Sequence, residues 1–509
     1  MTDEAVRTIP ALLARGEGPA LGAPGRADLD YAGLRALVER AAGQLAGWGA
    51  RPGDNVAIVL PNGPEMATAF LAVASCAIAA PLNPAYTEDE FAFYMEDLGA
   101  KALIALEGAE TPARAAAARL SIPVLDLCVA EAEPAGAFAL SQAGSPLPET
   151  AAQFNGPDDV ALVLHTSGTT SRPKIVPLTA RNVCASAASI AATLRLTPED
   201  RCLNIMPLFH IHGLIAAVLT TVSAGAFIAC TPGFNAMKFF GWMEAVKPSW
   251  YTAVPTMHQA ILSRAERNAE IVAATPLRFV RSSSASLPAP VFQALEETFG
   301  CPVIEAYGMT EASHQMASNQ LPPGKRKPGA VGAAAGPEIA IFDADGRALG
   351  TDEAGEICIR GENVTPGYRD NPKANAESFR DGWFRTGDEG VMDADGFIRI
   401  TGRLKEMINR GGEKVMPREV DDVLVEHPAV AQAVTFALPH DKLGEEVAAA
   451  VVLREGESVD ARALRDFAGK SLAPFKVPRE IVFLDEIPKG ATGKLQRIGL
   501  AEKLGLVKA

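Results

Sequence analysis

The sequence lacks the features that mark disulfide-rich, nucleic-acid-binding and secreted proteins. Its seven cysteines are scattered and no two form a C-x-x-C pair, so we expect reduced thiols and neither a disulfide framework nor a zinc site. Basic residues are in the minority and the formal net charge is -14, which argues against a nucleic-acid partner. Residues 1–4 begin acidic, without a basic-then-apolar signal pattern. These absences together predict a cytoplasmic protein.

Long apolar runs are also lacking. Residues 213–230 carry little charge, but they include Thr220, Thr221, Ser223 and two glycines. This composition favours a buried helix, a turn at 223–225 and a short strand over a membrane span. We therefore expect no membrane insertion, and the sequence gives no indication of oligomeric state.

What the sequence does contain is an alternation of strand-like and helix-like patterns. Residues 55–60 and 102–106 have the pattern of buried strands, and the Ala-rich segment 64–76 between them that of a helix. The alternation continues to about residue 304, with 201–207 and 277–281 as further strand candidates. Such alternation is typical of parallel sheets covered by helices.

The pattern changes twice in the second half of the 509 residues. Short β-rich runs separated by Asp-Gly turns fill about 329–400. Beyond the hinge-like segment 403–405, the expected order is helix 417–426, strands 430–438 and 446–453, helix 460–472 and strand 481–484. We predict an α/β fold with a large N-terminal domain (1–402) that has parallel sheets and a small β-rich subdomain, then a hinge (403–405) and a small, mobile α+β C-terminal domain (406–509).

The strongest local signal is the hydroxyl-rich, glycine-hinged loop 165–174, which ends at Lys174. A predicted strand, 160–164, leads into it, and a helix is expected from near Asn182. This arrangement presents backbone N–H groups and hydroxyls to one anion, such as a polyphosphate. The spacing from Gly168 to Lys174 does not match the common P-loop. The less favoured alternative for the segment on its own is a solvated Ser/Thr turn.

Three later motifs follow this loop. Residues 307–311 read Tyr-Gly-Met-Thr-Glu, which combines a ring for stacking, a hydroxyl and a carboxylate that could hold Mg²⁺. Residues 383–388 place Asp388 in a turn, where it could accept hydrogen bonds from ribose hydroxyls. Residues 490–494 place Lys494 on a Gly/Thr loop. Each motif is weak alone, but their order and spacing form a strong pattern.

The combined pattern, from about Leu29 to Gln496, resembles the adenylate-forming superfamily of acyl-CoA synthetases, carrier-loading adenylation domains and luciferases. The resemblance implies ATP, Mg²⁺ and CoA. It places the ATP phosphates on Thr166, Ser167, Gly168, Thr169, Thr170, Lys174 and Thr310, the adenine by Tyr307 and Gly308, the ribose on Asp388 and Arg403, and Mg²⁺ on Glu311. It makes Lys494, His210, Thr166 and Glu311 the catalytic residues, Lys405 the hinge, and Gly411 and Gly412 part of the CoA channel. Ser171 and Ile175 stand where the family commonly has glycine.

The expected acid site is polar. It comprises residues 207–213, the serine-rich run 281–286 and His314. A long acyl chain requires an apolar tunnel, so these residues favour a small polar acid, and a second carboxylate would explain the donors. Within the superfamily, residues 281–287, 311–314 and 250–259 look most similar to those of oxalate-CoA ligases. That similarity implies oxalate as the substrate, with Ser284, His314 and His210 as the acid-binding residues.

Several alternatives remain open at this stage. Malonate or another small acid fits the same physics, and a carrier-loading enzyme, a luciferase-type oxygenase or an inactive nucleotide-binding protein are more distant alternatives. His212 and His258 are more often structural histidines than ligands. For Arg281, a structural ion pair and a ligand role are equally plausible, and Ser282 and Ser283 could simply satisfy backbone groups.

Overall fold

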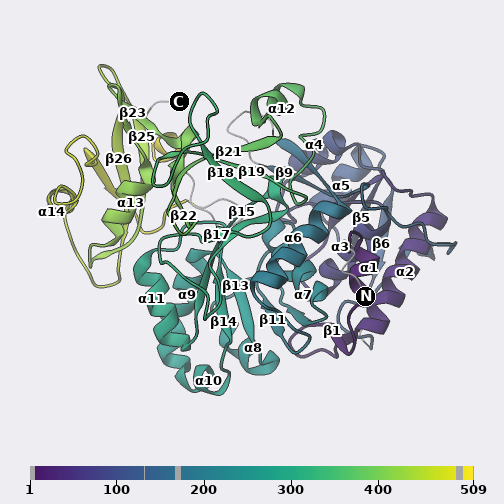
Figure 1. Cartoon of the computed structure of the whole chain (residues 1–509). Helices are drawn as coiled ribbons and strands as arrows, with labels where there is room; N and C mark the ends of the chain where they lie inside the picture. The colour runs from purple at the N-terminus through teal and green to yellow at the C-terminus, as the bar shows by residue number, and fades with distance from the viewer. Residues whose placement is uncertain (1–5, 131, 167–172, 489–496, 508–509) are drawn as a thin grey trace.

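The computed structural model describes residues 6–130, 132–166, 173–488 and 497–507. These residues form four β-sheets, which Figure 1 shows as three adjoining units and one separate unit at the C-terminal end. Two sheets are large and mainly parallel, as the alternating pattern predicts. The third is antiparallel and the fourth is mixed.

The largest sheet has nine strands, six of which run parallel in its centre. In spatial order the strands are β17 (Ala333–Ala334), β16 (His314–Ser318), β15 (Val303–Met309), β14 (Phe279–Ser282), β13 (Trp250–Ala253), β11 (Arg201–Asn204), β12 (Phe227–Cys230), β1 (Pro19–Gly22) and β2 (Leu29–Asp30). The pairs at both edges are antiparallel.

The second sheet has eight strands with a parallel centre. Its order is β10 (Lys174–Thr179), β9 (Val160–Thr166), β4 (Ile78–Pro81), β3 (Asn55–Val59), β5 (Ala102–Leu106), β6 (Val124–Cys128), β7 (Ala139–Gln142) and β8 (Ser145–Pro146). β9 and β10 pair antiparallel, so the hydroxyl-rich loop joins two adjacent strands.

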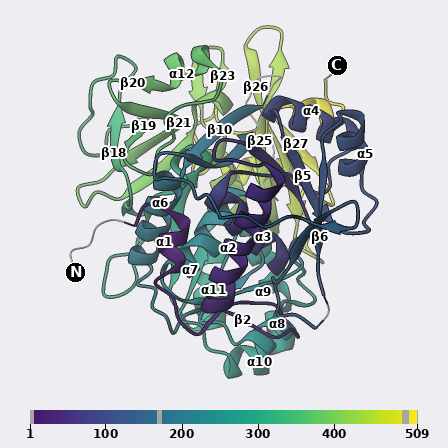
Figure 2. The same ribbon diagram turned by 90° about the vertical axis from the view of Figure 1, so that its right-hand side faces the viewer.

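Helices α3 (Pro64–Cys76) and α6 (Ala180–Thr193) lie between the two large sheets and contact strands of both. Every residue of α3 except Glu65 is buried, as expected for a helix that is apolar all round. Helix α6 begins with a capping box between Thr179 and Asn182. Figure 2 shows α2 (Tyr31–Trp48) beside α3, near α1 (Ile9–Leu13).

Other helices cover the outer faces of the two sheets. Apolar residues of α4 (Glu88–Leu98) and α5 (Pro112–Arg119) share a core with the eight-stranded sheet. The outer face of the nine-stranded sheet shares a core with helices that include α8 (Phe239–Val246), α9 (Pro255–Ala265) and α11 (Ala289–Phe299). The remaining helices of this region are η1 (His212–Leu219), α7 (Thr220–Ser223), η2 (Glu266–Asn268), α10 (Ala269–Ala274), η3 (Thr310–Ala312), α12 (Pro372–Ser378) and η4 (Leu404–Glu406).

The third sheet packs on the same hydrophobic core as the two large sheets, whereas the fourth has cores of its own. The third contains β18 (Glu338–Phe342), β19 (Gly355–Arg360), β21 (Trp383–Met392), β20 (Phe379–Arg380) and β22 (Ile398–Arg403). The C-terminal domain contains β24 (Glu413–Val415), β23 (Ile408–Arg410), β26 (Gly444–Leu453), β25 (Val430–His440), β27 (Glu480–Phe483), α13 (Pro417–Val425), α14 (Ala461–Ala468) and α15 (Leu500–Lys503).

The predicted α/β fold is confirmed, and most predicted elements are present with small differences at their ends. Helix α3 has the predicted bounds, but the strand expected at 201–207 stops at Asn204, whose side-chain oxygen accepts a hydrogen bond from the Met206 N–H. The helix expected at 460–472 ends at Ala468, before Gly469. Residues 213–230 fold as helix, turn and strand, and none of the helices in the described residues has the length and apolarity to cross a membrane.

Candidate functional site

The predicted site residues gather where the nine-stranded sheet, the eight-stranded sheet and the third sheet meet. In Figure 1 the labels of β9, β15, β21 and β22 lie close together at this place. Hydrogen bonds confirm the junction, because side chains from β15 and η3 contact side chains of residues 368–403. Parallel strands ending at one edge make such junctions frequent ligand sites.

The first group of site residues, here called the Asp388 cluster, consists of Tyr307, Asp388 and Arg403. The Tyr307 hydroxyl donates to Asp388 Oδ2 at 2.5 Å, and Arg403 Nε donates to Asp388 Oδ1 at 2.9 Å. Asp388 raises the pKa of Arg403 above its usual range, and burial raises the pKa of Tyr307. The carboxylate is thus paired with a cation and held next to the tyrosine. Asp388 lies within β21, paired with Arg403 of β22, so the turn expected at 383–388 is wrong.

The second group, the Glu311 cluster, consists of Lys174, Tyr368 and Glu311. The Tyr368 hydroxyl donates to Glu311 Oε1 at 2.9 Å, and Lys174 Nζ lies 4.1 Å from the centroid of the Tyr368 ring. Burial raises the pKa of Glu311 and lowers the pKa of Lys174. A partly desolvated lysine and a buried carboxylate therefore flank one tyrosine, an arrangement suited to a polyanion with its counter-cation.

A tight turn holds Glu311 and His314 in place. β15 and β16 pair antiparallel across η3, which carries Thr310 and Glu311. A side chain on Gly308 would meet the backbone oxygen of His314 at 1.8 Å, so this position requires glycine. The close approach fixes the geometry between the Glu311 cluster and His314.

Five predicted site residues lie outside the described part of the chain, and Lys494 is the only catalytic one among them. Thr166 ends β9 and Lys174 begins β10, so the predicted phosphate loop starts and ends on two paired strands. Ser167, Gly168, Thr169 and Thr170 lie between them, outside the described residues, and so does Lys494.

On the acid side, His212 is the common neighbour of the three predicted acid-binding residues. Its Nδ1 lies 3.0 Å from Ser284 Oγ, and its ring centroid lies 5.0 Å from that of His314. Its backbone N–H donates to His210 Nδ1 at 3.3 Å. His212 is fully buried and begins the π-helical segment η1, an irregularity frequent at functional sites. The structure therefore brings Ser284, His314 and His210 together around a residue that sequence reasoning treated as structural.

The backbone at this point is strained. Ser284 has φ 73° and His314 has φ 101°, in the region that non-glycine residues seldom adopt. Strain of this kind persists only where surrounding contacts enforce it, and it clusters at ligand sites. Ser284 follows the end of β14, and His314 begins β16, and both strands belong to the nine-stranded sheet.

Arg281 lies behind His212, fully buried in β14. Its Nη1 donates to Thr252 Oγ1 at 3.5 Å and its Nη2 to Gln315 Oε1 at 3.3 Å. Burial lowers the pKa of Arg281 to about 9, so the guanidinium remains charged at neutral pH. Within the part of the chain that the structure describes, Arg281 makes no ion pair with a carboxylate. The ion-pair interpretation of this residue is thus wrong for the described residues.

Ser283 and His258 make contacts that fit structural roles, whereas Ser282 does not. Ser283 Oγ donates to the Ala306 backbone oxygen at 2.9 Å, as expected. Ser282 Oγ, in contrast, is buried without a hydrogen-bond partner among the described atoms, so the same expectation is wrong for Ser282. His258 is fully buried beside the Tyr251 hydroxyl, and burial lowers its pKa to about 3. A permanently neutral histidine of this kind fits a structural role.

The hinge segment that leads into the C-terminal domain lies near the site. Lys405, in η4, lies close enough to Lys174 to contribute to lowering its pKa. Arg497 Nε lies 3.1 Å from Glu406 Oε2 and thereby ties η4 to the C-terminal domain. Gly411 and Gly412 form the turn between β23 and β24 with φ 60° and 98°, values that favour glycine.

Glu311 is not part of a larger group of metal ligands. The described residues contain no cluster of three or more His, Cys, Asp or Glu side chains able to hold a metal ion. A single carboxylate is nevertheless a usual protein contribution to Mg²⁺ that is bound mainly by phosphate oxygens. The residues present therefore fit Mg²⁺ delivered with a nucleotide.

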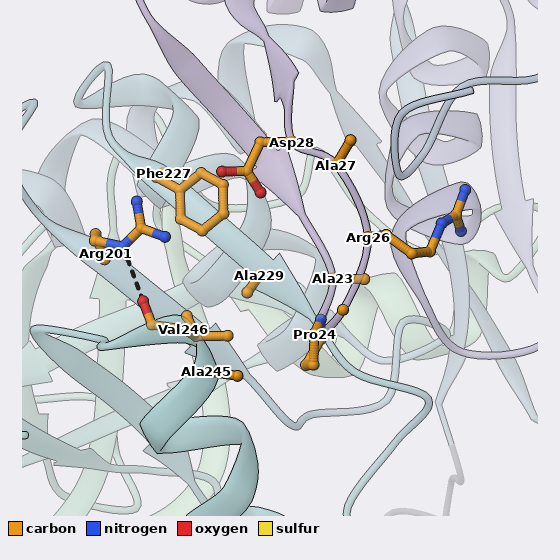
Figure 3. A pocket seen from close by; sticks show the side chains of 11 residues that line it. Ala23, Pro24, Arg26, Ala27, Asp28, Arg201, Phe227, Ala229, Ala245 and Val246 are labelled. Carbon is orange, nitrogen blue, oxygen red and sulfur yellow. Dashed lines mark hydrogen bonds between the residues drawn. The ribbon is translucent and has the colours of Figure 1, made fainter. Parts of the chain in front are cut away.

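A separate cavity of about 320 Å³ lies at the other end of the nine-stranded sheet and contains none of the predicted site residues. Figure 3 shows Arg201 beside the ring of Phe227, with Asp28 nearby. Arg201 stacks 3.9 Å from the Phe227 centroid and donates to the Val246 oxygen at 3.0 Å. The second arginine that lines this cavity, Arg26, pairs with Glu65, so both of its arginines are already engaged.

Sequence reasoning missed two residues of the site. Tyr368 follows Gly367 in a Pro-Gly-Tyr turn, which marks a loop but gives no sign of the contact with Glu311, 57 positions away. Thr252 lies within β13, where a threonine is ordinary. Its Oγ1 lies 2.6 Å from His212 Nε2. Both contacts arise only when strands from distant parts of the sequence come together.

Comparison with known proteins gives consistent matches over the whole chain. The AMP-binding enzyme family matches residues 13–369, and the AMP-binding enzyme C-terminal domain matches 419–494. The chain is 46% identical over 483 residues to the oxalate–CoA ligase of Arabidopsis thaliana, covering 94% of each protein. It is 43% identical to the oxalate–CoA ligase of Saccharomyces cerevisiae, covering 88% of this chain and 86% of that protein. The crystal structure of ATP-bound MatB from Rhodopseudomonas palustris is similar with a TM-score of 0.88 and 30% identity, covering 98% of each chain.

Proposed function

The chain belongs to the AMP-binding enzyme family, and from this premise we propose that it ligates oxalate to CoA at the expense of ATP. The reaction is oxalate + ATP + CoA giving oxalyl-CoA, AMP and diphosphate. The identity of 46% and 43% to two oxalate–CoA ligases over most of the chain supports this proposal. The observation that carries it is the His212 cluster, defined as His212, Ser284, His314, Thr252 and Arg281, which combines hydrogen-bond donors with a buried cation.

In the first half-reaction, a carboxylate oxygen of the acid attacks the α-phosphorus of ATP, and the bond to the β-phosphate oxygen breaks. Both reactants are anions, so cations must face the developing charge. Lys494 would supply one, and Lys174 and the hydroxyl loop from Thr166 would hold the phosphates. Glu311 would hold the Mg²⁺ that neutralises the phosphate oxygens.

The Asp388 cluster would bind the nucleoside. Asp388 is fixed by Tyr307 and Arg403, and its remaining acceptor capacity suits the two ribose hydroxyls. Tyr307 and Gly308 would lie next to the adenine, and Thr310 next to the phosphates. This cluster would set the position of the α-phosphate relative to the acid.

At the acid end, Ser284, His314 and His210 would contact the carboxylate that does not react. A second buried carboxylate is costly without donors and a counter-charge. The His212 cluster offers both, whereas a long acyl chain would require an apolar tunnel. Malonate, the second candidate, carries the same two charges and is favoured by the same donors.

In the second half-reaction, the CoA sulfur attacks the carbonyl carbon of the acyl-adenylate and AMP leaves. We propose that residues 1–402 act as one domain and residues 406–509 as another that rotates about 403–405. Lys405 would act as the pivot, and the Gly411–Gly412 turn would then line the CoA channel. The free thiols of all seven cysteines support a cytoplasmic location.

The test is diphosphate release with oxalate, malonate, acetate, coumarate and octanoate, each at saturating ATP, Mg²⁺ and CoA. We expect oxalate to give the highest kcat/KM and octanoate to give almost none. A preference for coumarate or octanoate would overturn the proposed acid site, and no release with any acid would indicate an inactive nucleotide-binding protein.

A further inference from the structure

Behind the acid-binding residues, an unbroken row of polar side chains leads inward to a buried cation. Ser284 Oγ lies 3.0 Å from His212 Nδ1, and His212 Nε2 lies 2.6 Å from Thr252 Oγ1. Thr252 Oγ1 in turn accepts from Arg281 Nη1 at 3.5 Å. Thr252, His212 and Arg281 are fully buried, whereas Ser284 is half-buried. The row therefore connects the floor of the acid site with the interior of the nine-stranded sheet.

The direction of these hydrogen bonds is fixed at the inner end. An arginine guanidinium carries donors only, so Thr252 Oγ1 must accept from Arg281. The orientation of Arg281 is itself set by Gln315, whose Nε2 donates to the Ala335 oxygen at 3.0 Å and leaves Oε1 to accept from Arg281 Nη2. The Thr252 hydroxyl hydrogen then has one acceptor among the contacts of the described residues, His212 Nε2.

The direction of the hydrogen bond from Thr252 also fixes the direction of the hydrogen bond between His212 and Ser284. In a neutral imidazole, one nitrogen accepts and the other donates. If Nε2 accepts from Thr252, Nδ1 carries the hydrogen and donates to Ser284 Oγ. The Ser284 hydroxyl hydrogen is then left to point away from His212, toward the acid. Hydrogen bonds in such a row polarise one another in the same sense.

We propose that Arg281, Thr252 and His212 are positioning residues that hold Ser284 as a hydrogen-bond donor to the non-reacting carboxylate of the acid. The proposal rests on the proposed function, since it concerns how the same site selects a dianionic acid. The buried guanidinium supplies the positive charge without touching the acid. Because it can only donate to Thr252, it sets the direction of the hydrogen bonds from Thr252 through His212 to Ser284.

The first test is a double-mutant cycle with Thr252→Val and Ser284→Ala, read as KM for oxalate and KM for ATP. Thr252→Val removes the hydroxyl and keeps the shape of the side chain. We expect Ser284→Ala to raise the oxalate KM by about 10- to 100-fold, the range for hydrogen bonds to charged groups, and Thr252→Val to raise it by about 3- to 10-fold, the range for a neutral hydrogen bond. In the Ser284→Ala background, Thr252→Val should have almost no further effect, because it acts through Ser284.

Thr220→Val is the matched control. Thr220 lies buried in α7, and its Oγ1 has no hydrogen-bond partner among the described atoms, so this variant should keep the wild-type KM values. Effects of Thr252→Val and Ser284→Ala that add would overturn the proposal, as would an equal rise in the ATP KM.

The second test does not depend on turnover. Protein labelled with ¹⁵N-histidine, with the His212 signal identified by its loss in His212→Asn, should show the Nδ1–H tautomer for His212. An Nε2–H tautomer or an imidazolium at His212 would overturn the proposed hydrogen-bond direction, even if Thr252→Val and Ser284→Ala fail to fold.

The two proposals can fail separately. If the wild-type protein activates oxalate or another dicarboxylate but the two substitutions act additively, the positioning role fails and the proposed ligase function stands. If the preferred dicarboxylate is malonate, the cycle is measured with malonate and decided in the same way. If the wild-type protein activates no dicarboxylate, both proposals fall.

Discussion

The nucleotide end and the acid end of the site differ in how their charges are balanced. At the nucleotide end, Asp388 is paired with Arg403, and Glu311 lies beside Tyr368 and Lys174. At the acid end, Arg281 is buried against neutral partners, Thr252 and Gln315. A buried charge without a counter-ion is unfavourable. The charges at the nucleotide end are therefore already compensated within the chain, and the proposed function predicts that an anion completes the acid end.

The largest effect on activity is expected for Lys494, which would act where the ATP and the acid meet. Lys494→Ala should lower acyl-adenylate formation by about 10²- to 10³-fold, the scale of losing one transition-state donor. Thioester formation from a supplied acyl-adenylate should be retained, because the lysine is needed only while the phosphate bond forms. The measurement is single-turnover kinetics of each half-reaction, with Lys442→Ala, an exposed lysine of the same domain, as control. Equal losses in both half-reactions would contradict the role.

Asp388→Asn tests nucleotide binding, because it keeps the shape of the side chain and removes the charge paired with Arg403. We expect the ATP KM to rise by about 10- to 100-fold and the oxalate KM to change by less than about twofold, given the strength of charge-assisted hydrogen bonds. Steady-state kinetics with each substrate varied gives the comparison. Asp393→Asn, at a turn outside the site where Asp393 pairs with Lys327, is the control. A larger effect on oxalate than on ATP would mean that the two ends are not independent.

The proposed rotation of the C-terminal domain can be tested at Lys405. Lys405→Pro fixes φ at the pivot and should impair one half-reaction at least about tenfold more than the other. Lys405→Ala, which leaves the backbone free, should affect both only slightly. The two half-reactions are measured separately, and equal impairment by proline would count against a rotating C-terminal domain.

The acid end can be weakened by His314→Ala. We expect the oxalate KM to rise by about tenfold and the ATP KM to stay unchanged, since one contact with a charged group contributes about 1.5 kcal/mol or more. His427→Ala, in the C-terminal domain against Phe467, is the matched control. The reverse pattern, with a rise only for ATP, would assign His314 to the nucleotide end.

The smallest effect concerns stability rather than activity, at a carboxylate that lacks the compensation seen at Asp388. Burial raises the pKa of Glu305 from 4.5 to about 7, although Arg418 of α13 partly opposes the shift. Because its pKa is raised in the folded state, the contribution of Glu305 to stability is fully present below pH 4.5 and is lost as the pH rises through about 7. Glu305→Gln should therefore make the decrease in melting temperature between pH 5 and 8 smaller than in the wild type.

The control for this measurement is Glu297→Gln, at an exposed position of α11. It should reproduce the wild-type dependence of the melting temperature on pH. An equal dependence of the melting temperature on pH in the wild type and in Glu305→Gln would contradict a raised pKa of Glu305 in the folded protein.

The sequence predicted the positions of helices and strands better than the side-chain contacts between distant residues. Helix α3 was predictable to the residue, because Pro64 suits the first turn and the segment is apolar all round. The end of β11 was not, because a side-chain hydrogen bond of Asn204 turns the chain early. His212 was assigned a structural role, since its neighbours Ser284 and Thr252 lie 72 and 40 positions away. Contacts across that distance depend on strand order, which local pattern does not specify.

The central claim is that the acid end selects a second negative charge. The most direct measurement compares kcat/KM for oxalate and for oxamate, which has the same size but replaces one carboxylate with a neutral amide. The account predicts a preference for oxalate of about 100-fold or more, because the carboxylate would gain at least two charge-assisted hydrogen bonds. Equal kcat/KM values for the two acids would contradict it.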